Sequence, residues 1–250
     1  HSAPTRLGGQ QAGQSGLDPG FGVMARADSA DLLDVARHEL GYSGQDRRFP
    51  RKDTCLAIYS HCMNTQKPLE TTLSDAFPWC AEWEAELKSL FRRYVESKLA
   101  QQVLDYDDLL LYWHALMQNG PLARDVESLF DHVLVDEYQD TNTLQSEILL
   151  ALKPSGKGLC VVGDDAQSIY SFRAANVENI LAFPARFSPP ELQIALEGTY
   201  RSTRAILDAA HARMPYATRQ VDPSLRPTRD DRTLPRTATV RDETSQRLYE

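Results

Sequence analysis

The sequence predicts an α/β fold built on a parallel sheet, with a mostly helical subdomain before it. Two short β-branched runs, "VLV" at 133–135 and "LCVV" at 159–162, are each followed by acidic residues. Apolar residues with helical spacing lie between these runs and dominate residues 23–120. Strands that alternate with helices indicate βαβ crossovers, and therefore a parallel sheet. A chain of 250 residues, 42 % of them hydrophobic, is long enough for one large domain or two smaller ones.

Composition narrows the classes of function. The formal net charge of −8 argues against nucleic-acid binding through bulk positive charge, although a local basic groove remains compatible with it. No apolar run approaches the roughly 18 residues of a membrane span, and the first residues lack the apolar core of a signal peptide. A cytoplasmic location without a membrane partner is therefore expected. The four cysteines form no CxxC pair, which predicts reduced, mostly buried thiols.

The first half of the chain has the pattern of helices. Residues 1–22 are rich in Gly, Gln and Ser, and are interpreted as a remnant of a broken element followed by a flexible stretch. Residues 23–120 are expected to form the helical subdomain. Its first helix would be capped by Ser29 or Asp31 and ended by Gly41. The predicted helices cover about 29–40, 53–64, 80–99 and 105–118.

The second half alternates between strands and helices. Residues 121–214 are expected to form the core around the sheet. Beyond Met214 the chain is rich in Pro and Arg, so that 215–250 is interpreted as a linker with one short strand at 237–243. The predicted elements in order are a strand at 132–137, a helix at 141–152, a strand at 159–165, a helix at 177–187, a strand at 191–197 and a helix at 202–214.

Two adjacent carboxylates, Asp136 and Glu137, end the first strand of this core. Ligands of parallel sheets bind at the carboxyl ends of the strands. Neighbouring strand residues point to opposite sides, so one carboxylate could hold a metal ion while the other addresses a water molecule. That arrangement suits Mg²⁺-dependent nucleotide hydrolysis. The alternative is that the pair only ends a strand and starts a turn.

The second strand leads into "GDDAQSIYSFR". Gln167 can form a hydrogen bond with a phosphate. Phe172 beside Arg173 combines a stacking surface with a cation, a pairing used to bind single-stranded nucleic acid. The alternative interpretation places Tyr170 and Phe172 in the core at the base of the next helix.

The third strand leads into "EGTYRST". Arg201 could contact a phosphate in bidentate fashion, and Tyr200 could stack on a base. The alternative is a capping motif with a solvated arginine. Three successive strand ends with compatible chemistry are less frequent by chance than any one of them.

In this order, "LDYDDLL", "VDEYQDTN", "VVGDDAQSIYSFRAA" and "LEGTYRS" resemble the motifs of UvrD/Rep-type superfamily I DNA helicases. The resemblance is strong over residues 105–213, and residues 22–104 resemble more weakly the helical insertion of the first RecA-like domain. It implies an incomplete RecA-like sheet of the P-loop NTPase type, with ATP and Mg²⁺ as cofactors. The implied parent activity is 3′-to-5′ movement on single-stranded DNA with duplex unwinding. Implied partners are single-stranded DNA, its junctions with duplex DNA, and repair or recombination proteins.

The resemblance also implies individual roles. Asp136 would hold the Mg²⁺ of Mg·ATP, and Glu137 would activate the attacking water. Asp107 and Asp108 would hold the helical insertion against the core. Thr199 replaces the family's usual Asn, which weakens local hydrogen bonding. The other implied roles are support of the same motif by Gln139 and Asp140, γ-phosphate sensing by Gln167, adenine stacking by Tyr200, γ-phosphate contact by Arg201, and DNA contacts by His1, Tyr170, Phe172 and Arg173.

No phosphate-binding loop of the form GxxxxGK[ST] occurs in the sequence. Lys157, in "SGKG", follows a glycine, but Gly158 stands where Ser or Thr is required. The resemblance therefore implies an internal fragment of a helicase that alone binds Mg·ATP weakly and does not unwind duplexes. The alternatives are a non-catalytic, helicase-derived module that binds DNA or protein, and an α/β fold with unrelated metal-dependent chemistry.

Overall fold

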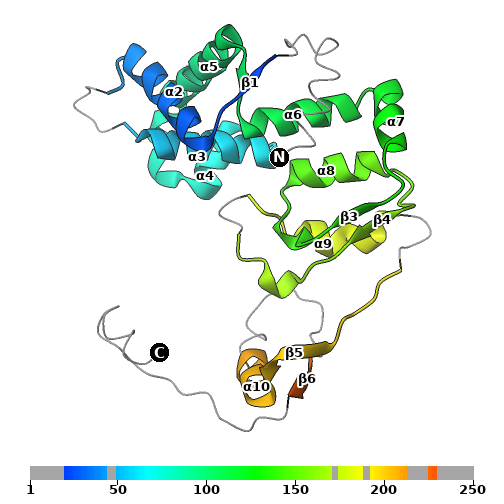
Figure 1. Ribbon diagram of the computed structural model, residues 1–250. Helices are drawn as coiled ribbons and strands as arrows, with labels where there is room; N and C mark the ends of the chain where they lie inside the picture. Colours follow the sequence, from blue (N-terminus) through cyan, green and yellow to red (C-terminus); the bar gives the residue numbers. More distant parts are fainter. Residues whose placement is uncertain (1–19, 44–48, 171–173, 188–191, 213–224, 230–250) are drawn as a thin grey trace, which may run out of the picture. The chain divides into compact units, whose positions relative to one another are not determined.

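The computed structural model describes residues 20–43, 49–170, 174–187, 192–212 and 225–229 (Figure 1). These residues form a mixed α/β structure, mostly helical, with three two-stranded parallel sheets. The chain divides into two compact units between residues 191 and 192, and each unit is described by itself. This division falls inside the stretch 121–214 that the sequence led us to expect as one core.

Four helices form the first part of unit 1, and the apolar spacing predicts three of them. They bury one cluster of side chains in which Leu33, Leu87 and Leu90 are fully inaccessible. Helix α2 packs against α3 and α5. The predicted helix at 80–99 is in fact a 3-10 turn followed by a long helix, and α4 was not predicted. The elements are α2 (Arg26–Glu39), α3 (Lys52–Thr65), α4 (Leu69–Ala76), η1 (Pro78–Trp83) and α5 (Glu84–Gln101).

The start of α2 differs from the prediction. The helix begins at Arg26, so Ser29 lies within its first turn, is buried, and donates its hydroxyl to the Ala25 carbonyl oxygen at 3.1 Å. Asp28 accepts the Ala25 amide at 3.0 Å, which is the contact that closes this end. The predicted caps are therefore wrong, because they were placed one turn too late. Gly41 does follow the helix in the left-handed conformation, with φ of 75°.

A short parallel pair links the start and end of this helical part. Strand β1 (Gly22–Val23) pairs with β2 (Val103–Leu104), and neither was predicted, because two-residue strands carry no periodicity. Helix α6 (Tyr106–Met117) follows at once, confirming the predicted helix at 105–118. Helix α7 (Gly120–Ser128) was not predicted, since "NGP" was interpreted only as a breaker. Proline at the first turn of a helix is well tolerated.

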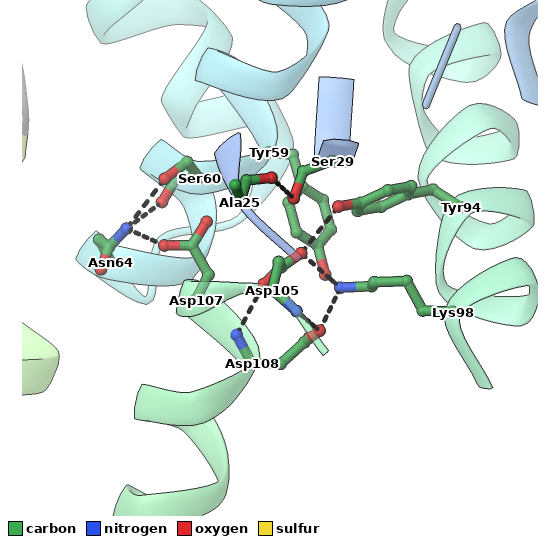
Figure 2. Close-up of polar contacts among 10 residues, drawn as sticks. All are labelled: Ala25, Ser29, Tyr59, Ser60, Asn64, Tyr94, Lys98, Asp105, Asp107 and Asp108. Atoms are coloured by element: carbon green, nitrogen blue, oxygen red, sulfur yellow. Dashed lines mark hydrogen bonds and ion pairs between the residues drawn. The ribbon is translucent and has the colours of Figure 1, made fainter. Parts of the chain in front are cut away.

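A buried ion cluster connects α5 to α6 (Figure 2). The Lys98 ammonium, 2 % exposed, lies 2.7 Å from Asp105 Oδ2 and 2.6 Å from Asp108 Oδ2. It also lies over the rings of Tyr94 and Tyr59, 4.5 and 5.0 Å from their centroids. Burial lowers the pKa of Lys98, but the two carboxylates more than offset that effect and leave this pKa raised. Asp108 thus ties α6 to α5, and its predicted role in holding the helical insertion against the core stays a prediction.

The central sheet of unit 1 is a parallel pair. Strand β3 (Val133–Val135) lies beside β4 (Leu159–Val161), with Val133 opposite Leu159 and Val135 opposite Val161. Helix α8 (Thr143–Leu152) connects them, which confirms the predicted βαβ unit. Asn142 caps α8 by accepting the Gln145 amide at 2.8 Å. A second apolar cluster packs α6 and α7 with α8, through Met117, Val126, Leu144, Ile148 and Leu152.

One face of this sheet departs from the prediction. Both strands were expected to be buried, as in parallel sheets covered on both faces. Instead Leu134 is 78 % exposed and Val162 is 51 % exposed, and Cys160 between them is exposed as well. Among the described residues, none covers the face of the β3–β4 pair that carries Leu134, Cys160 and Val162. The remaining cysteines, Cys55, Cys62 and Cys80, are free and buried, as predicted.

Unit 2 contains a third parallel pair. Strand β5 (Gly198–Thr203) pairs with β6 (Arg226–Arg229), and α10 (Arg204–His211) follows β5 directly. The predicted strand at 191–197 is wrong, because residues 192–197 form no strand and the pairing begins at Gly198. Strand β6 lies inside the expected linker 215–250, whereas the predicted strand at 237–243 lies outside the described residues. In the described part of the chain, no helix combines the length and apolarity that crossing a bilayer requires.

Candidate functional site

The first acidic pair lies in a turn rather than in a strand. Strand β3 ends at Val135, and both Asp136 and Glu137 are exposed. Glu137 adopts the left-handed conformation, with φ of 52° and ψ of 44°, and its amide donates to Asp136 Oδ1 at 3.0 Å. The expected strand alternation therefore does not set the directions of these carboxylates. A left-handed glutamate costs of order 1–3 kcal/mol, and such strain concentrates at functional sites.

Two buried residues anchor this turn, which continues as η2 (Tyr138–Asp140). The Tyr138 amide donates to the Val162 carbonyl oxygen at 2.9 Å, which extends the ladder beyond both strands. The Tyr138 hydroxyl is 2.9 Å from Ser146 Oγ, and its ring meets Phe183 edge to face at 5.2 Å. Burial raises the pKa of the Tyr138 hydroxyl, so it remains protonated and able to donate. The acidic turn is thus fixed to the sheet and to α8.

Gln139 links the two strand-end turns. Its side chain is 1 % exposed. Its Nε2 donates to Glu137 Oε2 at 2.7 Å, and its Oε1 accepts the Asp164 amide at 3.0 Å. The sequence interpretation placed Gln139 in the same motif as Glu137, but gave no sign of its bond to the second turn.

The second turn is organised by Asp164, which the sequence interpretation missed. Asp164 caps the short helix η3 (Asp165–Gln167): its Oδ1 accepts the Ala166 amide at 3.0 Å. Its Oδ2 accepts Gln167 Nε2 at 2.8 Å, and its carbonyl oxygen accepts the Gln167 amide at 3.0 Å. An aspartate just before a tight turn is a typical cap, and that signal could have identified it. The structure therefore connects Glu137 and Gln167 through Gln139 and Asp164.

Asp140, the other predicted motif residue, lies at the end of η2. Its amide donates to the Glu137 carbonyl oxygen at 2.9 Å, which tightens the turn. Its Oδ1 is buried and has no hydrogen-bond partner within the described part of the chain. Buried polar atoms without partners are rare in native structures. The supporting role of Asp140 stays a prediction.

Asparagines connect the acidic turn to the helical part of unit 1, a contact between distant segments that no local pattern predicts. Asn179 Nδ2 donates to the carbonyl oxygens of Thr141 and Asn142, at 3.0 and 3.1 Å. Asn142 Nδ2 donates to Asn64 Oδ1 at 2.7 Å, and Asn64 Nδ2 donates to Asp107 Oδ1 at 2.7 Å. Burial, with a contribution from Asp105, raises the pKa of Asp107. Four separate segments thus meet beside the acidic turn.

The predicted DNA-contacting residues are only partly described. Tyr170 is half-buried, and its carbonyl oxygen accepts the Ala175 amide at 3.3 Å. His1, Phe172 and Arg173 lie outside the described residues. Their predicted position along single-stranded DNA therefore stays a prediction.

The predicted residues of the third strand belong to unit 2. Tyr200 is 80 % exposed on β5, and Arg201 beside it is exposed too. The Arg201 amide lies 3.4 Å from Thr199 Oγ1, so the threonine at this position keeps a local hydrogen bond. Because the two units are not placed relative to each other, the meeting of Arg201 with Asp136 and Gln167 stays a prediction.

The residues present fit a magnesium nucleotide better than a resident metal. No group of three or more His, Cys, Asp or Glu side chains that could hold a metal ion occurs in the described ranges. Mg²⁺ in nucleotide sites needs only one or two protein carboxylates, because phosphates and water complete its shell. Two exposed carboxylates at the end of a parallel strand meet that requirement.

Comparison with known proteins identifies the family of this chain. The family model described as "UvrD/REP helicase N-terminal domain" matches residues 1–188. The chain is 32 % identical over 213 residues to proteins named "ATP-dependent DNA helicase PcrA" from Staphylococcus epidermidis and Staphylococcus aureus. Each alignment covers 84 % of this chain and 28 % of the relative, so the chain spans less than a third of their length. A family model that matches residues 1–188 and relatives that are 32 % identical over 84 % of the chain show that the chain belongs to the UvrD/Rep helicase family.

Proposed function

We propose that this chain is part of an ATP-dependent DNA helicase that couples ATP hydrolysis to 3′-to-5′ movement on single-stranded DNA and to duplex unwinding. Its unit 1 would supply the RecA-like core with the helical insertion. Support comes from the family match and from relatives named as ATP-dependent DNA helicases. Single-stranded DNA and its junctions with duplex DNA are the proposed substrates. Repair or recombination proteins are the proposed partners, and the cytoplasm is the proposed location.

One observation carries this proposal. The hydrogen bonds from Glu137 through Gln139 and Asp164 to Gln167 join the ends of two neighbouring parallel strands. A hydrolytic carboxylate and a phosphate-sensing amide must respond to the same terminal phosphate. A continuous set of hydrogen bonds between them supports such a shared task. The alternative, in which the acidic residues only end the strands, does not explain why buried Gln139 forms hydrogen bonds with both turns.

The side chains have distinct proposed tasks. Asp136 would hold Mg²⁺, and Glu137 would orient the attacking water and accept its proton. Bound Mg²⁺ would neutralise charge on the phosphate oxygens. Gln167 would sense the γ-phosphate, with Asp140 supporting the turn. The proposed contacts from the rest of the chain are Tyr200 with the adenine, Arg201 with the γ-phosphate, and His1, Tyr170, Phe172 and Arg173 with the DNA strand.

The test uses the protein encoded by the longest reading frame that contains this chain. We expect ATP hydrolysis that single-stranded DNA stimulates, and unwinding of duplexes with a 3′ single-stranded tail. The 250-residue chain, assayed in parallel, should show neither activity. If the reading-frame product binds DNA but does not hydrolyse ATP, the alternative of a non-catalytic module replaces this proposal. If the 250-residue chain alone hydrolyses ATP, the expectation that this chain is inactive by itself is wrong.

A further inference from the structure

The side-chain amide of Gln139 makes one specific bond at each end. Its oxygen accepts from a backbone amide, that of Asp164 at 3.0 Å, and its nitrogen donates to a carboxylate, that of Glu137 at 2.7 Å. Gln139 itself is 1 % exposed, whereas Glu137 is exposed at the surface of the turn. Hydrogen bonds to charged groups are among the stronger ones in proteins.

The orientation of this amide is forced by its neighbours. The Asp164 N–H can only donate, so it requires the amide oxygen of Gln139. The nitrogen therefore faces Glu137, whose ionised carboxylate can only accept. A flipped amide would set two donors against each other at one end and two acceptors at the other. Of the two orientations of the Gln139 amide, only the observed one satisfies both partners, and an ionised glutamate at position 139 could not donate to Glu137.

The side chain of Gln139 packs closely against Gly163. Gly163 has no side chain, and a Cβ there would lie 2.5 Å from Gln139 Oε1 and 2.7 Å from Ile180 Cδ1. Tyr138 beside it is fixed by its own hydrogen bonds. The amide of Gln139 therefore lies in close contact with the backbone at Gly163, where only glycine leaves room for it.

We propose that Gln139 is a positioning residue, which fixes the carboxylate of Glu137 relative to the turn that carries Gln167. This inference rests on the proposed function, since it assigns Gln139 a task in ATP hydrolysis. Asp164 is the intermediate: its backbone bonds Gln139, and its side chain bonds Gln167 Nε2 at 2.8 Å. A phosphate oxygen that accepts from Gln167 Nε2 competes with Asp164 Oδ2 for that donor. The state of the phosphate site thereby reaches Glu137 through Gln167, Asp164 and Gln139.

Two substitutions test separately the hydrogen bonds of Gln139 with Asp164 and with Glu137. Gln139→Glu keeps an oxygen for the Asp164 amide, but sets a second carboxylate against Glu137. Gln139→Leu removes both bonds and keeps the approximate size. The matched control is Gln145→Glu. Gln145 uses only its oxygen, which accepts the Asn142 amide at 3.0 Å, so the same chemical change loses no donor bond there.

The first measurement is steady-state ATP hydrolysis by the longest reading-frame product, with saturating single-stranded DNA. Gln139→Glu should lower kcat by on the order of 10- to 100-fold while KM for ATP stays within about twofold, because a misdirected group affects the chemical step. Gln145→Glu should match the wild type. A Gln139→Glu variant with wild-type kcat, or one whose loss lies in KM alone, would overturn the proposal.

The second measurement does not depend on hydrolysis. Hydrogen exchange of the Asp164 amide in the 250-residue chain should stay slow in Gln139→Glu and become fast in Gln139→Leu. Equal exchange in all three proteins would show that Gln139 does not hold Asp164, and would overturn the proposal. If the reading-frame product of the wild type does not hydrolyse ATP, the proposed function fails, while the exchange data still decide whether the link between the turns exists.

Discussion

Replacement of Lys98 by Met tests the energetics of the helical part most sharply. Lys98 Nζ lies 2.7 Å from Asp105 and 2.6 Å from Asp108, and all three side chains are nearly or fully buried. Methionine fills a similar volume but removes the only cation that contacts both carboxylates among the described residues. Two like charges would then share a buried site with Asp107 close by.

The expected loss can be bounded from the remaining contacts. Removing one partner of a buried ion pair costs about 3–5 kcal/mol of unfolding free energy. Asp105 would keep the Tyr94 hydroxyl at 2.8 Å and the Asp108 amide at 2.8 Å, and Asp108 would keep the Asp105 amide at 3.0 Å. The retained bonds favour the lower end, about 3 kcal/mol. For a unit of this size, that corresponds to a melting temperature lower by roughly 6–12 °C.

The assay is urea unfolding of the 250-residue chain at neutral pH, followed by circular dichroism. Lys88→Met is the matched control: Lys88 is exposed on the same helix and pairs only with half-buried Glu84 among the described residues, so its loss should leave stability unchanged within error. Adding Asp108→Asn to Lys98→Met should recover part of the loss, since one uncompensated charge disappears. A single variant as stable as the Lys88 control, or a double variant less stable than the single one, would refute the reasoning.

Three further predictions concern the same unit. Stability should fall as pH rises through the raised pKa of Lys98, because the folded chain holds that proton more tightly than the unfolded one; an alkaline titration of unfolding free energy should show this slope in the wild type and not in Lys98→Met. Gly163→Ala should cost about 1–3 kcal/mol by overpacking against Gln139, whereas Gly198→Ala, with open space at its Cβ, should cost less; equal denaturation midpoints would contradict this. Asn64→Ala should cost about 1–3 kcal/mol, because it removes one hydrogen bond of Asp107 and the acceptor of Asn142 Nδ2, and a midpoint unchanged from the wild type would exclude the asparagine junction as a stabilising contact.

Much of the fold follows from local patterns that the sequence shows directly. Helical apolar spacing predicted α3 and α6 within about one residue at each end, and alternation of element types predicted the βαβ unit of β3, α8 and β4. The failures have physical causes. Strand β1 is too short to show a period. Residues 192–197 alternate between apolar and other residues but form no strand, because pairing with β6 begins only at Gly198.

The residues of the candidate site could be named from the sequence, but their contacts could not. Asp136, Glu137 and Gln167 were identified from their place after two strands, and the structure joins their turns through hydrogen bonds. The joining residues Gln139 and Asp164 act across 25 positions of sequence, so neither local pattern nor composition reveals their bond. Glu137 was expected to follow strand alternation, whereas its left-handed backbone sets its direction.

The most direct test of the account replaces Glu137 by Gln in the longest reading-frame product and measures DNA-stimulated ATP hydrolysis beside nucleotide binding. Glu147→Gln is the matched control, because Glu147 lies on α8 and pairs with His114 at 3.1 Å, away from the acidic turn. We predict that Glu137→Gln lowers kcat by about 10²- to 10⁴-fold, the usual contribution of a general base, while nucleotide affinity is retained. Hydrolysis at the wild-type rate in Glu137→Gln would remove this carboxylate from the reaction and contradict the central claim.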